Sequence, residues 1–454
     1  MVKPTSARGQ LSLGAFLHPS GHHVAAWRHP DALPDGGVNI ENYTRLARLA
    51  EAAKFDLIFL ADTAGVSDRN LAYISRTTRA SLFEPLTLLS ALSSVTTTIG
   101  LIATVSTSFN EPFNLARYFA SLDLISGGRS GWNLVTSGTE LEALNFSRPA
   151  HYGHAERYRR AGEFADVVKG LWDSWEDDAF LFDKESGRYS DPAKLHALNH
   201  RGEHFAVRGP LGVPRSPQGQ PVLVQAGSSP DGRDLAARTA EIIFTAQQTL
   251  ADAQEFYGDV KERLQTYGRE PSDLKILPGV FPVVGRSESE ARAKFDTLQD
   301  LVHPVVGLAY IAQHLGGIDL SGYPLDGPVP EILAETNGSK SRQQLLLDLA
   351  RRENLTIRQL YLRIAGARGH WQLVGTPRQI ADELEERFVT HGADGFNIMP
   401  PSPTGLDDFV ALVLPELRRR GLFRHDYDGH TLRDHLGLRR PANRFANPAA
   451  QAAE

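Results

Sequence analysis

Polar side chains stand at the carboxyl ends of several runs that the sequence predicts to be buried strands. The run S-G-G-R-S-G-W-N-L-V-T-S (126–137) leaves a helix through paired glycines and continues into a short strand rich in β-branched and aromatic residues. Asn133, Thr136 and Ser137 follow at its end. Because α/β enzymes bind ligands at the carboxyl ends of parallel strands, these residues predict a binding site. Hydrogen bonds to the local backbone are the alternative explanation.

Two other predicted strands end in the same way. Asp62 follows the apolar run F-D-L-I-F-L-A (55–61), which is typical of a strand buried on both faces. Thr104 lies at the end of I-G-L-I-A-T-V (99–105). Asp62 is therefore a candidate site residue, although a helix cap or a loop hydrogen bond would also explain its carboxylate.

The loop after the first predicted strand has an unusual composition. Residues 20–30 (S-G-H-H-V-A-A-W-R-H-P) include His22, His23 and Trp27. Two adjacent histidines do not easily face one metal ion from an extended chain, so the loop favours contact with a substrate over metal binding. A structural role for either histidine remains open.

Two predicted helix starts carry groups that can donate to an anion. His154 and Tyr158 are four residues apart and share one face of the predicted helix 155–175. Ser228 and Ser229 precede Pro230, which fits the first position of another helix, and free backbone N–H groups there can hold a phosphate. Ordinary serine capping is the alternative for this pair.

The alternation of strands and helices predicts a (β/α)8 TIM-like barrel. We expect one domain over 1–454, with a hairpin insertion at about 176–220 and a lid-like insertion at 302–372 that holds His314, Arg368, His370 and Trp371. A polar tail covers about 424–454, and we expect its last ten or so residues to be disordered. The eight predicted strands are 10–17, 55–62, 99–105, 132–136, 221–226, 241–245, 274–284 and 393–399.

Composition excludes several kinds of chemistry. The 454 residues contain no cysteine, which excludes disulfides, thiolate metal sites and a cysteine nucleophile. A net charge of -6 without basic runs argues against nucleic-acid binding. The chain has no G-x-G-x-x-G after its first strand and no P-loop motif. With no signal-like N-terminus and no apolar run of about 18 residues, we expect a soluble cytoplasmic protein without a membrane partner.

Seven short motifs in one order resemble a known family. They are A-W-R-H-P, F-D-L-I-F-L-A-D, G-L-I-A-T-V-S-T, G-G-R-S-G-W-N-L-V-T-S, N-F-S-R, Y-G-H-A-E-R-Y and P-V-L-V-Q-A-G-S-S-P-D-G-R. Together they resemble the bacterial-luciferase-like flavin-dependent monooxygenases over residues 10–440. Within that family the chain is similar to the branch of nitrilotriacetate monooxygenase component A and dibenzothiophene-sulfone monooxygenase.

The resemblance implies a luciferase-like barrel that uses reduced FMN (FMNH2) from a separate NAD(P)H:flavin oxidoreductase. It implies a C4a-(hydro)peroxide of the flavin that transfers one oxygen atom from O2 to a small organic substrate of chelator, sulfone or other xenobiotic type. A homo-oligomer, dimer or tetramer, is expected. Such chemistry agrees with a chain that lacks an evident nicotinamide site of its own.

Site residues follow from the same resemblance. Matched motif positions imply flavin contacts, with His154, Tyr158, Ser228 and Ser229 at the FMN phosphate and Asp62 and Thr104 nearer the ring or ribityl chain. Asn133 and Ser137 are further cofactor-binding candidates. On the substrate side the candidates are His22, His23 and Trp27, one histidine of which could bond the peroxide or accept a proton.

Three questions stay open on the sequence alone. A deazaflavin-dependent oxidoreductase on a similar barrel is a second hypothesis, and a non-catalytic flavin-binding protein is a third. The substrate is also open, because a polycarboxylate would need several convergent cations, and Arg28, Arg129, Arg148 and Arg368 are widely scattered.

Overall fold

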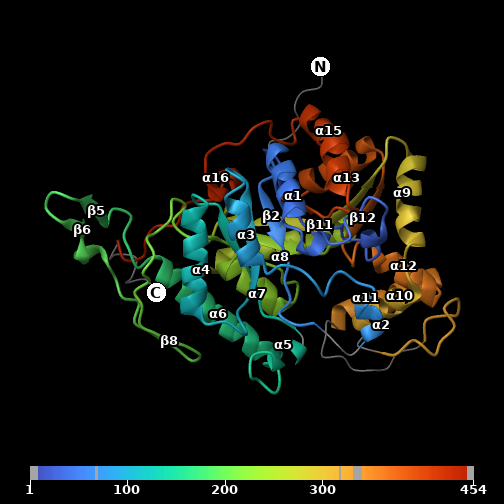
Figure 1. Cartoon of the computed structure of the whole chain (residues 1–454), viewed down its shortest axis with the longest axis horizontal. Coiled ribbons are helices and arrows are strands. Elements are labelled where there is room, and N and C mark those ends of the chain that lie inside the picture. Colours follow the sequence, from blue (N-terminus) through green and yellow to red (C-terminus); the bar gives the residue numbers. More distant parts are fainter. Residues whose placement is uncertain (1–8, 67–69, 139, 316–317, 331–339, 447–454) are drawn as a thin grey trace.

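Eight parallel strands form a closed barrel in the computed structural model, which describes residues 9–66, 70–138, 140–315, 318–330 and 340–446 (Figure 1). Pairing between β10 and β11 closes the ring. Each strand overlaps one predicted from the sequence, so the expected (β/α)8 barrel is confirmed. The order around the ring is β1 (Ser12–Phe16), β2 (Leu57–Leu60), β3 (Gly100–Ser106), β4 (Ser130–Val135), β9 (Val222–Gln225), β10 (Ile242–Thr245), β11 (Lys275–Val284) and β13 (Gly395–Ile398).

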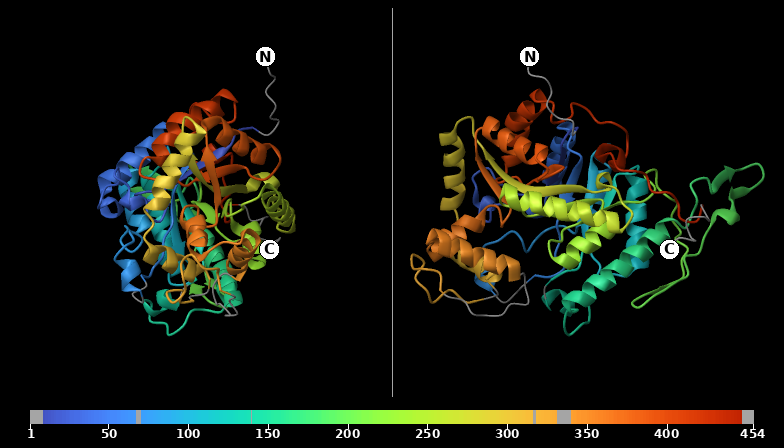
Figure 2. Two further views of the ribbon diagram at one scale, coloured as in Figure 1. Left: turned by 90° about the vertical axis from the view of Figure 1, so that its right-hand side faces the viewer. Right: turned by 180° about the vertical axis from the view of Figure 1, so that it is seen from behind.

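Helices cover the outside of the barrel (Figures 1 and 2). Most begin at a side chain that accepts a backbone N–H, as Thr249 does from Asp252 at the start of α8. In the described ranges, no helix is long and apolar enough to cross a membrane. The outer helices are α1 (Ile40–Ala52), α3 (Pro85–Ser93), α4 (Pro112–Ile125), α6 (His154–Trp172), α7 (Pro230–Thr239), α8 (Leu250–Thr266), α9 (Glu288–Asp300), α13 (Pro377–Val389), α14 (Gly405–Asp408), a π-helical turn (Phe409–Val413) and α15 (Leu414–Arg419).

Shorter helices lie in the connections. Two of them, α2 (Leu71–Ile74) and α5 (Glu140–Leu144), follow the second and fourth barrel strands. Single 3-10 turns occur at Ala26–Arg28, Gly36–Val38, Pro192–Lys194 and Pro271–Asp273.

Side chains along β4 point alternately to the outside and to the inside of the barrel. Trp132 points outward and packs between Phe119 of α4 and Phe164 of α6, with ring centroids 6.0 and 5.7 Å away. Gly131 points inward, where a Cβ atom would lie 2.3 Å from the Ile102 side chain of β3. The inward positions are therefore tightly packed at this level, and a ligand of such a barrel is expected nearer the carboxyl ends of the strands.

The first insertion forms two antiparallel hairpins. The pair β5 (Phe180–Asp183) and β6 (Arg188–Ser190) extends away from the barrel, and β7 (His200–Arg201) pairs with β8 (Ala206–Val207) (Figure 1). Both lie within the segment 176–220, which the sequence predicted to contain a hairpin.

The second insertion builds a small helical layer of its own. Its helices are α10 (Pro304–His314), α11 (Lys340–Glu353) and α12 (Ile357–Ala365). They share an apolar cluster with Val24 and Ala25 of the first loop. The insertion returns through β12 (Trp371–Gly375), a ninth strand paired to Val280–Val284 of β11 that the sequence analysis did not predict. Helical layer and first loop thus form one packed unit.

The C-terminal segment closes the amino end of the barrel. Helix α16 (Leu432–Leu436) places Leu432 and Leu436 in one cluster with the inward side chains Leu57, Ile102 and Val222. Further along, Phe445 stacks on His196 at 4.9 Å. The segment predicted as a polar tail is therefore packed up to residue 446, and the disorder predicted for its end concerns residues 447–454, which lie outside the described residues.

Replacing Leu432 by alanine should destabilise the fold markedly. Its side chain is fully buried against the barrel, and such truncations cost roughly 2–5 kcal/mol of unfolding free energy. Urea denaturation followed by circular dichroism measures the change. Leu33→Ala, at an exposed leucine, is the control and should cost less than about 0.5 kcal/mol. Equal losses of unfolding free energy in the two variants would contradict a sealing role for α16.

Candidate active site

Aromatic side chains form a floor near the carboxyl end of the barrel. Phe16 of β1, Phe59 of β2 and Phe244 of β10 pack edge to face or tilted, with ring centroids 4.9, 5.4 and 5.3 Å apart. His370 stacks on Phe244 at 4.9 Å. Gly279 makes this approach possible, because a Cβ atom there would lie 2.6 Å from the His370 ring. The floor is thus apolar and aromatic, and it is suited to contact with the ring system of a ligand.

Thr104 and Asn133 stand beside this floor on neighbouring strands. The Asn133 amide donates to the Thr104 hydroxyl at 2.9 Å. The amide oxygen of Asn133 is buried and has no hydrogen-bond partner among the described residues. Buried acceptors are almost always satisfied, so this oxygen indicates a ligand that brings an N–H or O–H group.

Of the three residues expected on the substrate side, His22 reaches the floor. It is fully buried, its ring lies 4.4 Å from that of Phe16, and its Nε2 lies 2.8 Å from the Phe16 carbonyl oxygen. Its Nδ1 lies 2.9 Å from a guanidinium nitrogen of Arg368. Because Arg368 can only donate, Nδ1 is the acceptor and Nε2 carries the proton.

His23 and Trp27 contact other parts of the molecule. The Nε2 atom of His23 lies 3.1 Å from the Gln299 amide oxygen on α9, and its Nδ1 accepts the backbone N–H of Ala25. Burial lowers the pKa of His23 to about 4. Trp27 donates its indole N–H to the carbonyl of Arg76. Both side chains therefore fasten the first loop, and the structure does not bring them to the floor.

Sequence reasoning missed His18, which lies two residues after the end of β1. Both ring nitrogens of His18 are buried and without a partner among the described residues. Its ring centroid lies 5.6 Å from that of His22. The position just after a strand end is the signal that selected Asp62, and the same rule applied to F-L-H-P would have selected His18.

Two arginines face these histidines. Arg79 donates to the carbonyl oxygen of His22 at 3.1 Å, and Arg368 lies with its guanidinium 5.6 Å from the Phe16 ring. Burial, followed by Arg79 and Arg368, holds the pKa of His18 well below its ordinary value, and burial with Arg368 does the same for His22. Two cations beside two neutral imidazoles make this side of the site electropositive.

The other scattered arginines do not converge here. Arg129 donates to the backbone carbonyls of Ser93, Thr96, Ile99 and Ser126, and so holds the turn before β4. Arg148 contacts Tyr152. Among the cationic candidates named from the sequence, only Arg368 joins the site.

The start of α7 lies next to the start of α6. The Ser229 hydroxyl accepts the N–H of Gly232 at 3.1 Å. It therefore caps α7, as the alternative explanation of ordinary serine capping predicted. Ser228 is exposed. His154, at the first turn of α6, points Nδ1 at Asp231 of α7, 3.3 Å away, and its ring lies 5.0 Å from that of Tyr158. Two helix N-termini with hydroxyl and imidazole donors form a corner suited to an anion.

Asp62 and Ser137 lie on the rim. Asp62 is exposed as a whole residue, but desolvation of its carboxyl group, with the nearby Glu84 and Glu142 carboxylates, raises its pKa to about 6. Ser137 has a positive φ of 54° and donates to the Ser106 hydroxyl at 2.7 Å. Both residues sit beyond the strand ends, as predicted from the sequence, and they share Glu142 as a neighbour.

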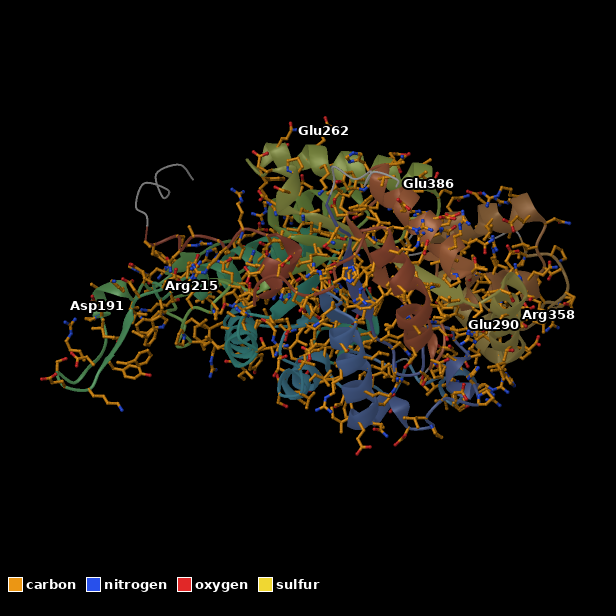
Figure 3. All side chains as sticks on the ribbon, turned by 90° about the horizontal axis from the view of Figure 1, so that it is seen from above. Asp191, Arg215, Glu262, Glu290, Arg358 and Glu386 are labelled. Atoms are coloured by element: carbon orange, nitrogen blue, oxygen red, sulfur yellow. The ribbon has the colours of Figure 1, made fainter. Side chains whose placement is uncertain are left out.

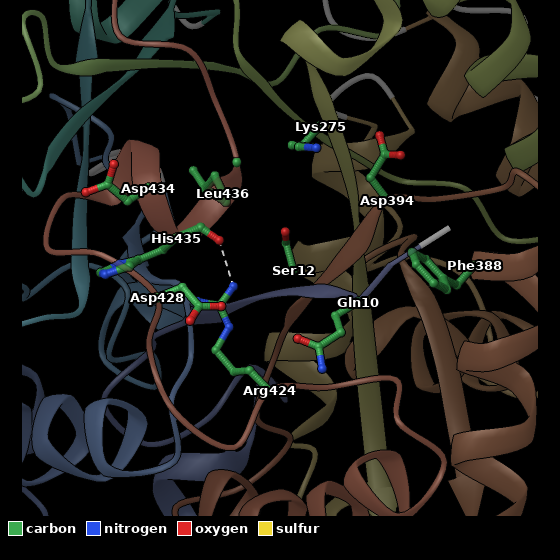
Figure 4. Close-up of a pocket in the computed structure, with 11 residues that line it drawn as sticks. Gln10, Ser12, Lys275, Phe388, Asp394, Arg424, Asp428, Asp434, His435 and Leu436 are labelled. Carbon is green, nitrogen blue, oxygen red and sulfur yellow. Dashed lines mark hydrogen bonds between the residues drawn. The ribbon is translucent and has the colours of Figure 1, made fainter. Parts of the chain in front are cut away.

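A polar cavity lies at the opposite end of the barrel (Figure 4). It measures about 250 Å³ and is lined by polar groups that include Ser12, Lys275, Asp394 and Arg424. These residues surround the amino ends of the strands, where barrel enzymes place stability contacts and not catalysis. We therefore assign the site to the carboxyl end. No cluster of three or more metal-ligating side chains occurs in the described ranges.

Comparisons with known proteins agree with this architecture. The luciferase-like monooxygenase family matches residues 20–395. The chain is 54% identical to N-acetyl-S-(2-succino)cysteine monooxygenase of Bacillus subtilis, over 97% of this chain and 100% of that protein. It is 53% identical to nitrilotriacetate monooxygenase component A of Aminobacter aminovorans, over 98% and 100%. It is 42% identical to dibenzothiophene-sulfone monooxygenase of Rhodococcus erythropolis, over 95% and 97%.

A solved structure adds the link to flavin. Riboflavin lyase, solved with a modified FMN and riboflavin, superposes with a TM-score of 0.84 at 33% identity, covering 97% of this chain and 99% of that one. The resemblance stated from the seven motifs, to the branch that includes nitrilotriacetate and dibenzothiophene-sulfone monooxygenases, is confirmed.

The electrostatics of the site can be tested by nuclear magnetic resonance. With isotope-labelled histidine, His18 and His22 should remain neutral between about pH 8 and pH 6, because burial and cationic neighbours disfavour their protonated forms. Arg368→Gln removes one of those cations and should shift both midpoints upward. Midpoints near the ordinary histidine value in the unmodified protein would contradict this arrangement.

Proposed function

The chain belongs to the luciferase-like monooxygenase family, and from this we propose that it is the oxygenase component of a two-component system that uses reduced FMN and O2. Its enzymatic class, a flavin-dependent monooxygenase, follows from its relatives. The choice of FMN, the reduced state and the separate reductase belong to the proposal. The observation that carries it is an apolar aromatic floor beside an unsatisfied buried amide oxygen, in a barrel that also has a corner suited to an anion at the starts of α6 and α7.

The ring of the flavin fits the barrel floor. Phe16, Phe59 and Phe244 offer apolar surface, and the buried Asn133 oxygen can accept a ring N–H of the isoalloxazine. Thr104 holds the Asn133 amide through its hydroxyl. Thr104 thus acts as a positioning residue, and Asn133 selects a ligand with a donor at that point.

The phosphate of FMN fits the corner between α6 and α7. Ser228, Ser229 and the free N–H groups of α7 can donate to it, and Tyr158 supplies a further hydroxyl. Because Nδ1 of His154 faces Asp231, Nε2 is the nitrogen left to donate. We place Asp62 and Ser137 on the rim between the two ends of the cofactor.

The residues of this chain would then control the access of water to the site and the transfer of protons within it. When bound, reduced FMN would supply the oxygen chemistry, in which one atom of O2 passes to the substrate and the other leaves as water, while Asn133 and the donors at the starts of α6 and α7 would hold the cofactor. Helix α12 leads directly to Arg368 and His370, and the first loop brings His22, so the two segments meet at the contact of 2.9 Å between Arg368 and His22. We infer that residues 302–372 act as a lid that keeps water away.

Reducing equivalents must come from outside the chain. No nicotinamide motif occurs in the sequence, and one relative is named as component A of its system. We propose an NAD(P)H:flavin oxidoreductase as the partner, which would place both proteins in the cytoplasm.

We further propose a small organic acid with several carboxylates as the substrate. Two relatives that are more than half identical act, by name, on N-acetyl-S-(2-succino)cysteine and on nitrilotriacetate, which are both polycarboxylates. Here Arg79 and Arg368 converge on His18 and His22 at the mouth. Guanidinium groups bind carboxylates through paired, charge-assisted hydrogen bonds, so they would orient such a substrate over the flavin.

The phosphate corner can be tested with a matched pair of serine caps. Ser229→Ala should weaken FMN binding by roughly ten- to 150-fold, because a charge-assisted hydrogen bond contributes roughly 1.5–3 kcal/mol. Fluorescence titration of FMN measures the affinity. Ser228→Ala tests the neighbouring hydroxyl in the same way.

Ser287→Ala is the control, since Ser287 caps α9 with the same geometry and its loss costs a similar ~0.5–2 kcal/mol of stability. It should leave the FMN affinity unchanged. Riboflavin, which has no phosphate, should bind equally to all variants. Unchanged FMN affinity in both Ser228→Ala and Ser229→Ala would remove this corner from the cofactor site.

A further inference from the structure

The chain contains very little sulfur. It has no cysteine, and its two methionines are Met1 and Met399. Met1 lies outside the described residues, so Met399 carries the one sulfur atom in the described part of the chain. Thiolates and thioethers are the groups of a protein that are oxidised by the addition of oxygen atoms. In this fold, such an oxidation would therefore be concentrated at Met399.

Met399 lies directly after β13, at the carboxyl end of the barrel. Its backbone N–H donates to the Val280 carbonyl at 2.8 Å, which holds it beside β11. Its side chain belongs to the same inward cluster as Phe16 of the floor. A Cβ atom at Gly279 would lie 3.0 Å from the Met399 Sδ atom and 2.6 Å from the His370 ring. The thioether therefore forms part of the floor, close to His370.

The sulfur is shielded from the solvent around the barrel. Met399 is 0% exposed and packs among apolar side chains that include Leu277 and Phe281. Figure 3 shows charged side chains such as Glu262 and Arg358 at the edge of the molecule, away from this interior. Susceptibility to oxidation follows exposure. An oxidant in the surrounding solution should therefore react slowly with Met399, whereas an oxidant formed at the floor starts beside it.

The proposed function supplies an oxidant at the floor, and the present inference rests on that function. When reduced flavin reacts with O2 and no substrate takes up an oxygen atom, two electrons and two protons pass to O2. Hydrogen peroxide is then released, a side reaction that a closed site must limit. The peroxide would form in the same apolar compartment that holds the thioether.

We propose that Met399 is a modification site, which hydrogen peroxide released at the floor oxidises to methionine sulfoxide. A lone pair of the sulfur attacks one oxygen atom of the peroxide, and the O–O bond breaks. The other oxygen atom leaves as hydroxide and takes the proton of the transferred oxygen, which gives water. The sulfur thus loses two electrons and the peroxide gains them.

Oxidation would change the floor at a crowded point. A sulfoxide is polar and carries one more atom than the thioether. It would lie next to Gly279, where even an added Cβ atom has no room. We expect it to displace His370 from its stacking on Phe244, which has a centroid distance of 4.9 Å. Turnover without substrate would therefore weaken the binding of FMN to the protein that releases the peroxide.

Uncoupled turnover in the presence of catalase tests where the oxidant comes from. The full-length chain carries Val389→Met, which adds a sulfur at a 39% exposed position at the end of α13. Bound FMN is reduced anaerobically with dithionite in the dark and reoxidised with O2 over several cycles, without substrate. Peptide mass spectrometry detects each added oxygen as a gain of about 16 Da. Because catalase destroys peroxide in solution but cannot enter the barrel, we expect at least about tenfold more sulfoxide at position 399 than at position 389.

Met399→Leu is the matched control, since leucine has a similar volume and no sulfur. Fluorescence titration measures the FMN affinity of each protein before and after the same cycles, and circular dichroism checks that both remain folded. The protein with Met399 should lose FMN affinity at least about tenfold as sulfoxide accumulates. Met399→Leu should keep the affinity that it had before the cycles.

Three results would overturn the proposal. They are equal oxidation at positions 399 and 389 with catalase present, oxidation at position 389 alone, and an equal loss of FMN affinity in Met399→Leu. A protein that binds FMN and keeps Met399 reduced would refute this inference and leave the proposed function standing. A protein that fails to bind FMN in the first titration would refute the proposed function, and the inference with it.

Discussion

The pairing of β10 with β11 closes the barrel, and every other feature of the site depends on this closure. A closed parallel barrel directs the carboxyl ends of all its strands to one mouth. Side chains far apart in sequence, from Phe16 to Phe244, therefore meet as one floor. The opposite end must be sealed, and Leu432 and Leu436 of α16 seal it. Stability and function are thus divided between the two ends of the same barrel.

The electrostatic character of the barrel mouth results from two imidazole groups that are buried next to guanidinium cations. His18 and His22 stay neutral because burial and the guanidinium groups disfavour their protonated forms. Arg368 is presented by the second insertion with a positive φ of 53°. The first loop, anchored through His23 and Gln299, places His22 against Arg368. Two chain segments that are distant in sequence are therefore both needed to complete the electropositive side.

Periodicity predicted the barrel well, and strand-end position selected candidate site residues that stay predictions. Apolar runs identified all eight strands, because buried parallel strands leave a continuous apolar signal. Thr104 and Asn133 were found because polar groups at strand ends stand out. The roles of His22, His23 and Trp27 could not be separated, since adjacent loop residues differ only in tertiary partners. Arg79 and α16 carried no periodic signal, and their positions depend on long-range packing.

The central claim, that this chain is an FMN-dependent oxygenase, is tested most directly by rapid mixing. The protein is mixed without oxygen with photoreduced FMN, and then with oxygenated buffer in a stopped-flow cell while flavin absorbance is recorded. The account predicts an oxygenated flavin intermediate that outlives the free species by orders of magnitude and decays faster with a polycarboxylate substrate. Reoxidation as fast as in protein-free buffer, with nitrilotriacetate or N-acetyl-S-(2-succino)cysteine present or absent, would contradict it.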